Sequence, residues 1–409
     1  MKRLRLLVVL LLFGSLTASS QVRWWGIYDF EVKKGGADSR PDLNGLPNSF
    51  TQLNVGQFQL FMDADISKTI SATTMFSNTP PRSFDLKNLE VHLAYVTFQN
   101  LIGDAVSVSV GKILTPFGRF SKRQLATDNP LIGQPCFYAY QLNVSPVIGY
   151  LDSAHVAGAA QQYGDRLTAM YTGGYYVGAE AFGSFLNGFA EYGAAVMNAP
   201  LSASSGDYNL DRGLAFHGRA ALHPAIWSTL GVSYAEGSFL QSAWTNQYFD
   251  SKIAHIDRFK QSTVGVDLLL SYLYYELNAE YIFNRFDAPY IVLQGDYLYT
   301  NGLPHGLSMN LDSNELLLDL KIETSLCPGL YLALRYDKLA FGDIQDPNPV
   351  SSTYGRSIPW DHSANRYAIG LGYKPEHSVL IKLGYEKTNL DLTPKPDLDV
   401  VGCAVVVSF

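Results

Sequence analysis

This sequence of 409 residues has little charge, few cysteines and no disulfide pattern. Charged side chains make up 16% of the chain, against about 25% in soluble globular proteins. The three cysteines, Cys136, Cys327 and Cys403, are odd in number and far apart, so they predict neither a disulfide framework nor a metal site with C-x-x-C spacing. This composition disfavours a soluble secreted domain.

Sequence motifs of enzymes are missing as well. There is no G-x-S-x-G elbow, no H-E-x-x-H zinc motif and no P-loop. No catalytic partner for His92 or His217 can be identified from the sequence, and we expect both side chains to contact water in the barrel interior. Asp63 and Asp65 share one face of a segment but lack the glycine turn of a calcium loop. We therefore expect no enzyme activity, no cofactor and no metal, and the acidic balance argues against a nucleic-acid partner.

The first twenty residues carry the pattern of an export signal. The first five residues contain three basic side chains, an apolar run follows to Phe13, and three small residues precede Gln21. This pattern predicts a cleaved secretory signal peptide over residues 1–20, too short to span a membrane as a helix. Its removal leaves 30 − 3 = 27 basic against 37 acidic residues, a net charge of −10. We expect residues 21–409 to form a single exported domain with no helical membrane span.

The chain does contain a regular alternation of apolar and polar residues in segments of about ten. Successive strand residues point to opposite faces, so each segment predicts a strand with one apolar and one polar face. The same alternation places Leu93 and Tyr95 on an apolar face. The polar faces, which we expect to line an interior, carry Asp63, Asp65, Glu90, His92, Arg219, Asp267, Glu280, Asp319, Lys321, Arg335, Asp337, Arg366, Lys382 and Glu386.

A soluble β-sandwich and a membrane barrel both produce such alternation, but they turn the apolar face in opposite directions. Three features favour the barrel. Apolar rows end in tyrosines such as Tyr336, Tyr373 and Tyr385, as an interfacial girdle requires. The segments are longer than the five or six residues common in soluble sheets. The polar rows mix glycine, serine and carboxylates, which suits a wet interior. In lipid, only a closed barrel lets strands pair every backbone polar group.

Short and long connections alternate along the chain. Short ones lie at about 67–68, 222–225, 273–274, 327–329 and 375–377, and long ones at about 34–52, 113–151, 237–260, 287–313 and 342–362. This arrangement is typical of bacterial membrane barrels, which favour even strand numbers. Seventeen candidate strands can be counted, with weak alternation between about Asp152 and Asp211. We predict an all-β fold, a closed antiparallel transmembrane β-barrel of about 16 strands, with 18 as the alternative.

Two segments resemble known membrane barrels. The terminal apolar row with Val405, Val407 and Phe409 resembles the assembly signal of Gram-negative outer-membrane β-barrel proteins. The loop at about 113–151 follows the fifth predicted strand and is the longest connection. Its position, its length and its opening sequence TPFGRF (Thr115 to Phe120) resemble the general diffusion porins, in which this loop folds into the barrel and narrows it.

The resemblance implies a pore constriction within this loop. The candidate constriction residues are Arg119, Lys122, Arg123 and Asp128. The three bases are also loosely similar to those of phosphate-selective porins, without any residue-level correspondence. The net acidic charge and Asp128 argue against strong anion selectivity. The alternative is a surface cap over the barrel mouth, although the aromatic content of the loop argues against full exposure.

Taken as a resemblance, these features imply an outer-membrane porin that passes small hydrophilic solutes and ions by diffusion through a water-filled barrel. The implied partners are outer-membrane lipid and the barrel-assembly machinery, with a homotrimer as one option for the assembly. Two alternatives stay open. One is a substrate-selective channel for an anion or a sugar, and the other is a plugged barrel that serves as an adhesin or scaffold.

Overall fold

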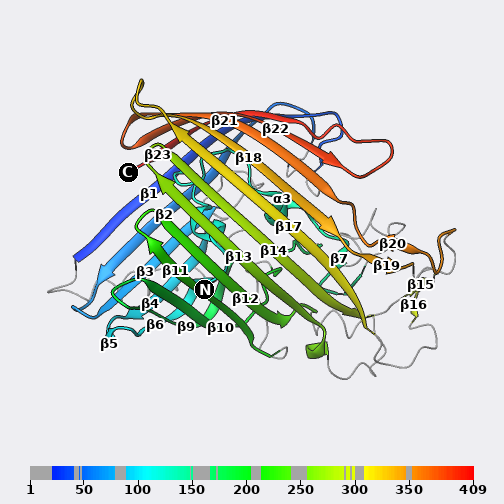
Figure 1. Cartoon of the computed structure of the whole chain (residues 1–409), viewed down its shortest axis with the longest axis horizontal. Helices are drawn as coiled ribbons and strands as arrows, with labels where there is room; N and C mark the ends of the chain where they lie inside the picture. The colour runs from blue at the N-terminus through cyan, green and yellow to red at the C-terminus, as the bar shows by residue number, and fades with distance from the viewer. Residues whose placement is uncertain are drawn as a thin grey trace, which may run out of the picture.

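The computed structural model describes residues 21–40, 46, 48–78, 89–147, 149–150, 166–171, 174–203, 213–240, 256–289, 292–294, 297–299, 308–346 and 352–409. The predicted signal peptide, residues 1–20, lies outside this part. In the described residues, sixteen strands form one closed barrel in which all neighbouring pairs are antiparallel (Figure 1). The predicted all-β barrel of 16 strands is therefore confirmed, and the alternative of 18 strands is wrong.

The barrel strands follow the chain order around the ring. They are β1 (Gln21–Gly35), β2 (Gln52–Asp65), β3 (Ile70–Asn78), β4 (Glu90–Phe98), β6 (Ser107–Leu114), β9 (Tyr175–Phe185), β10 (Ala190–Met197), β11 (Ala215–Ala225), β12 (Ser228–Ser238), β13 (Lys260–Tyr272), β14 (Tyr275–Pro289), β17 (Ser308–Glu323), β18 (Leu330–Phe341), β21 (Ala364–Glu376), β22 (Val379–Leu390) and β23 (Val400–Ser408).

Smaller elements lie in the connections. They are β5 (Leu101–Asp104), the hairpins β7 (Val144–Ser145) with β8 (Gly149–Tyr150), β15 (Val292–Gln294) with β16 (Tyr297–Tyr299) and β19 (Asp343–Gln345) with β20 (Ser357–Pro359), and the short helices η2 (Phe120–Arg123), α3 (Cys136–Ala139) and η4 (Ile256–Arg258). Within the described ranges, none of the helices is long and apolar enough to cross a membrane.

Alternation sorts the side chains of each strand between the two sides of the wall. On β21 and β22, Ile369, Leu371 and Leu383 point outward and are about half exposed, whereas Arg366 and Lys382 point inward and are buried. Large apolar residues are exposed in this way on strands all around the ring. Such a surface is stable when lipid covers it, because apolar side chains are then kept from water.

The long connection after the fifth barrel strand is longer than predicted. β6 pairs directly with β9, so the connection runs from Thr115 to Gly174 instead of ending near 151. No barrel strand lies between β6 and β9 in the ring. The surplus candidate strand was counted in the stretch from about 152 to 211, in which the structure describes two barrel strands, β9 and β10.

The predicted outward face of β4 is partly wrong. The register of β3 against β4 shifts after the Met75–Leu93 pair, so that an extra residue, His92, bulges out of the ladder. A bulge changes which face the following residues use. Leu93 consequently packs inside the barrel against the cluster around Met75, and Tyr95 packs against inward-facing Ile113.

The barrel closes between its first and last strands. β1 pairs with β23, and beyond this ladder Gly26 N donates to Phe409 O at 2.9 Å while Phe409 N donates to Gly26 O at 3.1 Å. The Phe409 ring covers Gly26 on the outer surface, where a Cβ would lie 2.5 Å from ring atom Cζ. Val405 and Phe409 are exposed on this outward side, on the face expected from the sequence.

An apolar core lies inside the barrel, contrary to the expectation of a wet interior throughout. Inward residues of three strands, Ile282, Leu317 and Leu339, belong to one buried cluster with Phe117 and Phe137 of the long connection. Because this connection covers them, the inward face of β14, β17 and β18 does not need to be polar. Alternation alone identifies the inward face but not what covers it.

Candidate functional site

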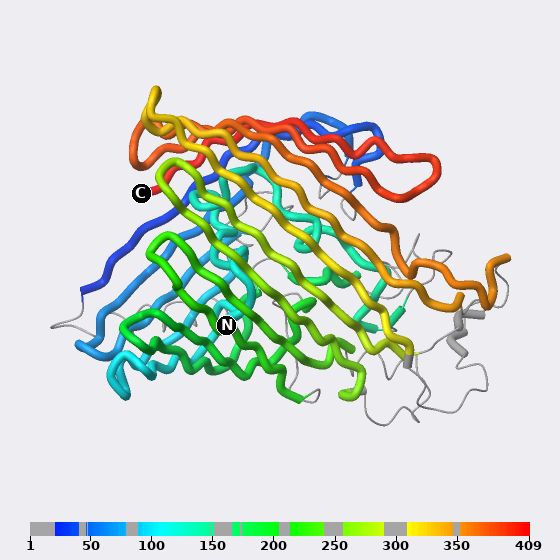
Figure 2. Tube along the Cα trace, viewed as in Figure 1, coloured from blue at the N-terminus to red at the C-terminus, as the bar shows by residue number. Residues whose placement is uncertain are grey.

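The segment 115–147 crosses the interior of the barrel. Figure 2 shows its trace within the ring of strands. On one side, Gln57 of β2 donates to Gln124 O at 2.9 Å and accepts from Ala126 N at 2.9 Å. On another, Cys136 N donates to Asp337 of β18 at 3.1 Å. We call residues 115–147 the lumen loop, because bonds to separate parts of the wall place it inside the lumen.

Three buried cations of neighbouring strands hold the lumen loop by its carbonyl groups. Lys382 Nζ donates to Ala126 O, Asn129 O and Leu131 O at 2.6, 2.7 and 3.3 Å. Arg335 donates to Gly133 O at 2.8 Å, and Arg366 donates to Gln134 O at 2.8 Å.

An ammonium group has three donors, so the three carbonyls satisfy Lys382 completely. Arg335 also forms a bidentate pair with Asp319 of β17 at 2.6 and 2.8 Å. Charge-assisted bonds of this kind are about twice as strong as neutral ones. The segment 126–134 is therefore fixed against β18, β21 and β22.

Wall acids hold the first part of the lumen loop. Glu280 Oε1 accepts from Arg119 N at 2.6 Å, and Asn278 accepts from the Arg119 guanidinium at 2.9 Å. Arg123 pairs with Glu276 at 3.0 Å. Gly118 has φ +60°, and a Cβ there would lie 2.2 Å from Glu280 Oε1, so glycine is required for this close approach.

The far part of the lumen loop is held by a carboxylate outside the barrel strands. Asp361 accepts from Tyr140 OH at 2.8 Å and from Asn143 N at 2.7 Å. Burial raises the pKa of Asp361 to about 6, although these hydrogen bonds oppose the shift. Burial also raises the pKa of the Cys136 thiol, which is fully enclosed beside Asp337 and therefore unreactive.

The four candidate constriction residues all lie in the lumen loop, but their surroundings differ. Arg119 and Arg123 face acids and amides of the wall, and burial lowers the pKa of Arg119. Lys122 and Asp128 are exposed. Although the residue as a whole is exposed, partial desolvation of its carboxyl group within the barrel raises the pKa of Asp128. The loop thus presents one exposed base and one exposed acid, instead of three bases.

The residues expected to line the interior occupy four kinds of position. Those that line the cavity described below are His92, Arg366, Lys382 and Glu386. Those in contact with the lumen loop are Glu280, Asp319, Arg335 and Asp337. Three are hydrogen-bonded to other wall residues: Asp63 accepts from Trp25 and Thr73, and Arg219 donates to Asp267. The remaining three have exposed side chains: those of Asp65 and Glu90 are about half exposed, and that of Lys321 is partly exposed.

His217 was expected to be a wet interior side chain, and this is wrong. It is fully buried, and its Nδ1 lies 2.6 Å from Thr115 Oγ1 at the start of the lumen loop. Its ring packs edge-on against Tyr176. The sequence places His217 on the inward face, but it does not reveal that the loop covers this position.

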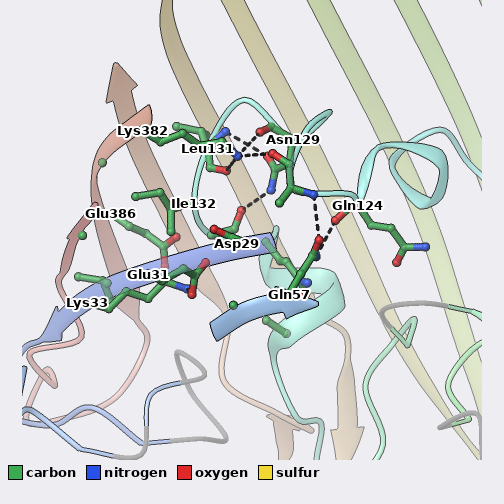
Figure 3. A pocket seen from close by; sticks show the side chains of 18 of the residues that line it. Asp29, Glu31, Lys33, Gln57, Gln124, Asn129, Leu131, Ile132, Lys382 and Glu386 are labelled. Carbon is green, nitrogen blue, oxygen red and sulfur yellow. Dashed lines mark hydrogen bonds and ion pairs between the residues drawn. The ribbon is translucent and has the colours of Figure 1, made fainter. Parts of the chain in front are cut away.

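A cavity of about 410 Å³, lined by charged, polar and apolar residues, remains between the lumen loop and the wall. Its lining comes mainly from β1 to β3, from 124–134 of the loop and from β21 to β23, with His92 of β4 and Tyr175 of β9. Figure 3 shows Asp29 and Glu31 of β1 near Asn129 and Leu131 of the loop. Alternation puts Asp29, Glu31 and Gln57 on inward faces, but only the structure places them around the same cavity. Within the described residues, no cluster of three or more metal-binding side chains is present.

No protein-family model matches this sequence, and no functionally curated protein matches it. Solved structures match its fold. The outer-membrane channel DcaP of Acinetobacter baumannii is 11% identical with a TM-score of 0.59, over 96% of this chain and 98% of that one. An anion-selective porin from Comamonas acidovorans is 10% identical with a TM-score of 0.55, over 96% of this chain and 100% of that one.

The outer-membrane protein OmpT of Vibrio cholerae, folded in vitro and solved in a trimer form, is 8% identical with a TM-score of 0.54. That match covers 96% of this chain and 100% of that one. Identities this low show the fold alone. The chain has the fold of outer-membrane porins.

Proposed function

We propose that this chain, which has the fold of outer-membrane porins, is a channel for passive diffusion of small hydrophilic solutes and ions across the bacterial outer membrane. The observation that carries the proposal is the cavity of about 410 Å³ between the lumen loop and the wall, whose lining includes several charged side chains. A sixteen-stranded barrel is wide enough to hold an aqueous lumen. The lumen loop then sets the size limit, and wall charges bias which ions enter.

The charge pattern favours a modest preference for cations. Two of the three loop bases lie against wall acids or amides, and three wall bases lie against loop carbonyls. Lys122 and Asp128 are exposed and opposite in charge. The net charge of −10 expected for residues 21–409 is therefore not offset by a basic constriction.

Planar-bilayer recording on purified protein comprising residues 21–409 tests this function. We expect steady ohmic current steps and a reversal potential on the cation side under a KCl gradient. Changing Lys122 to Gln should shift the reversal potential further toward cations, and changing Asp128 to Asn should shift it the other way. A folded barrel that gives no current steps contradicts the channel.

A plugged barrel that serves as a scaffold or adhesin is the second candidate. The apolar cluster inside the barrel favours it, because residues such as Phe117, Phe137 and Trp360 fill part of the lumen. Liposome swelling with small sugars separates the two candidates. Swelling that depends on the protein supports the channel, and its absence together with electrical silence supports the plugged barrel.

The export, membrane insertion and oligomeric state of the channel belong to the same proposal. We expect export by the signal peptide over 1–20, insertion by the barrel-assembly machinery and contact of the outward apolar belt with outer-membrane lipid. Because the similar OmpT was solved in a trimer form, a homotrimer is the assembly to test. Mass measurement of the detergent-solubilised protein distinguishes it from a monomer.

A further inference from the structure

Two carboxylates converge on one point of the cavity wall. Asp29 and Glu31 both face inward from β1, and both are buried. They meet over Gly56 of β2, where a Cβ would lie 2.7 Å from Asp29 Oδ2 and 2.5 Å from Glu31 Cδ. The absence of a side chain at Gly56 is what lets the two carboxyl groups lie side by side. A cation close to both carboxyl groups would stabilise their ionised forms.

Neighbouring acceptors on the same wall have no partner. The atoms Asp29 Oδ1, Gln59 Oε1 and Asn78 Oδ1 are buried, and none of them receives a hydrogen bond within the described part of the chain. The three side chains line the cavity from β1, β2 and β3. Buried polar groups are nearly always satisfied, so a group of unpartnered acceptors points to a missing donor.

Lys33 and Lys382, which line the cavity, already have partners, whereas the buried Nη2 of Arg366 has none within the described residues. Lys33 pairs with Glu31 at 2.6 Å. Lys382 donates to three loop carbonyls, and Arg366 contacts Glu386 at 3.1 Å and donates to Gln134 O. Gln57 is also occupied, since it bonds both Gln124 and Ala126 of the loop. The wall therefore offers the unfilled acceptor of Asp29 next to the ion pair of Glu31 with Lys33.

Lys33 offsets the charge of Glu31, and a water molecule at the unpartnered oxygen of Asp29 would supply a donor but no positive charge. A protonated amine supplies both a positive charge and several donors, and its bonds to carboxylates are charge-assisted. We propose that Asp29 and Glu31, with Gln59 and Asn78 in the lining of the same cavity, bind the protonated amine group of a small solute there. This inference rests on the proposed channel function and names a solute class for it.

The site can be tested by planar-bilayer recording in KCl, with propylammonium added as the probe. Propylammonium that dwells at the site should reduce the potassium current. We expect Asp29→Asn to raise the half-blocking concentration by about tenfold or more, the factor for losing one charge-assisted hydrogen bond. Glu31→Gln should act in the same direction and provides a second variant if the first fails to fold. Propionate, of similar size and opposite charge, should not block at the same concentration.

Asp63→Asn is the matched control, because it removes an inward acid of β2 whose oxygens are already bonded to Trp25 and Thr73. It should leave the half-blocking concentration unchanged. The site is overturned if wild type and both cavity variants respond equally, if Asp63→Asn has the same effect, or if propanol blocks as well as propylammonium.

Titration calorimetry on the folded protein in detergent separates this inference from the channel itself. A barrel that conducts but binds propylammonium independently of Asp29 removes the site and keeps the channel. A silent barrel whose affinity for propylammonium falls about tenfold or more in Asp29→Asn keeps the site and removes the channel.

Discussion

Single residues of the wall decide where the lumen loop lies. Lys382 is the clearest case, since one buried ammonium group contacts three separate carbonyls of the loop. The sequence predicts that Lys382 faces inward, because it alternates with Ile381 and Leu383. It does not predict the partner, since the carbonyls come from a segment about 250 residues earlier, and backbone carbonyls leave no trace in a sequence.

Changing Lys382 to Met tests this contact at the residue scale. Methionine keeps an unbranched stem but leaves the carbonyls of Ala126, Asn129 and Leu131 without their donor, at about 1–3 kcal/mol for each that stays buried. We expect a looser loop, seen as larger and noisier single-channel currents. Lys387→Met is the control, because Lys387 is exposed and lies 3.9 Å from its partner Asp399. Unchanged currents in Lys382→Met would contradict an anchoring role.

The prediction that the outward face of the wall meets lipid can be tested at Ile369. This residue lies in the middle of β21 and is about half exposed. Changing Ile369 to Arg should destabilise the folded barrel by about 2–4 kcal/mol if lipid covers this position near the bilayer midplane. Ile369→Val should have little effect, because the side chain stays apolar. Unfolding by urea in lipid vesicles measures both. Equal stability of the two variants would contradict a membrane-facing wall.

At the scale of elements, alternation identifies most strands and their faces. It fails at a β-bulge and in a loop whose path depends on tertiary contacts. In β4 the extra residue His92 reverses the face of Leu93 and Tyr95, and a bulge has no reliable sequence signal. The lumen loop was recognised by its length and position. Its path was not predictable, because it depends on bonds to strands spread over the whole ring.

The contact of the lumen loop with Asp361 should depend on pH. Burial raises the pKa of this carboxyl from 3.8 to about 6, so the folded state holds the proton more tightly than the unfolded state. The stability from this group is thus complete below 3.8 and is lost as pH rises through about 6. We expect hydrogen-exchange protection of the Asn143 amide to fall over that range. Asp361→Asn should remove this dependence, and a persistent pH effect in that variant would assign it to another group.

The last strand can be tested through Phe409. Deleting Phe409 removes its two backbone hydrogen bonds to Gly26 and the ring that covers this glycine. We expect export to continue but the amount of heat-modifiable barrel in the membrane to fall severalfold. Phe409→Tyr keeps the bonds and the aromatic ring and should assemble normally. Normal assembly after the deletion would show that the terminal aromatic is dispensable.

At the scale of the whole molecule, the sequence predicted the outward apolar faces better than the contents of the barrel. In the proposed membrane setting the outward faces must be apolar, which is a strong periodic constraint. The inward faces carry Asp29 and Lys382 as well as Leu317 and Leu339. Either type is permitted, depending on whether water or the lumen loop lies opposite. The amine site therefore required the structure, because its acceptors are ordinary inward residues until the cavity brings them together.

The apolar cluster inside the barrel and the apolar belt outside it are stabilised by different forces. In the proposed membrane setting, lipid tails are as apolar as the side chains that they cover, so release of water does not hold the outer side chains to one another. Inside, Phe117, Phe137 and Leu317 are removed from water when the loop docks, and this driving force weakens on cooling. Low temperature should therefore loosen the loop before it affects the wall, and conductance corrected for the viscosity of the electrolyte should rise as the sample is chilled.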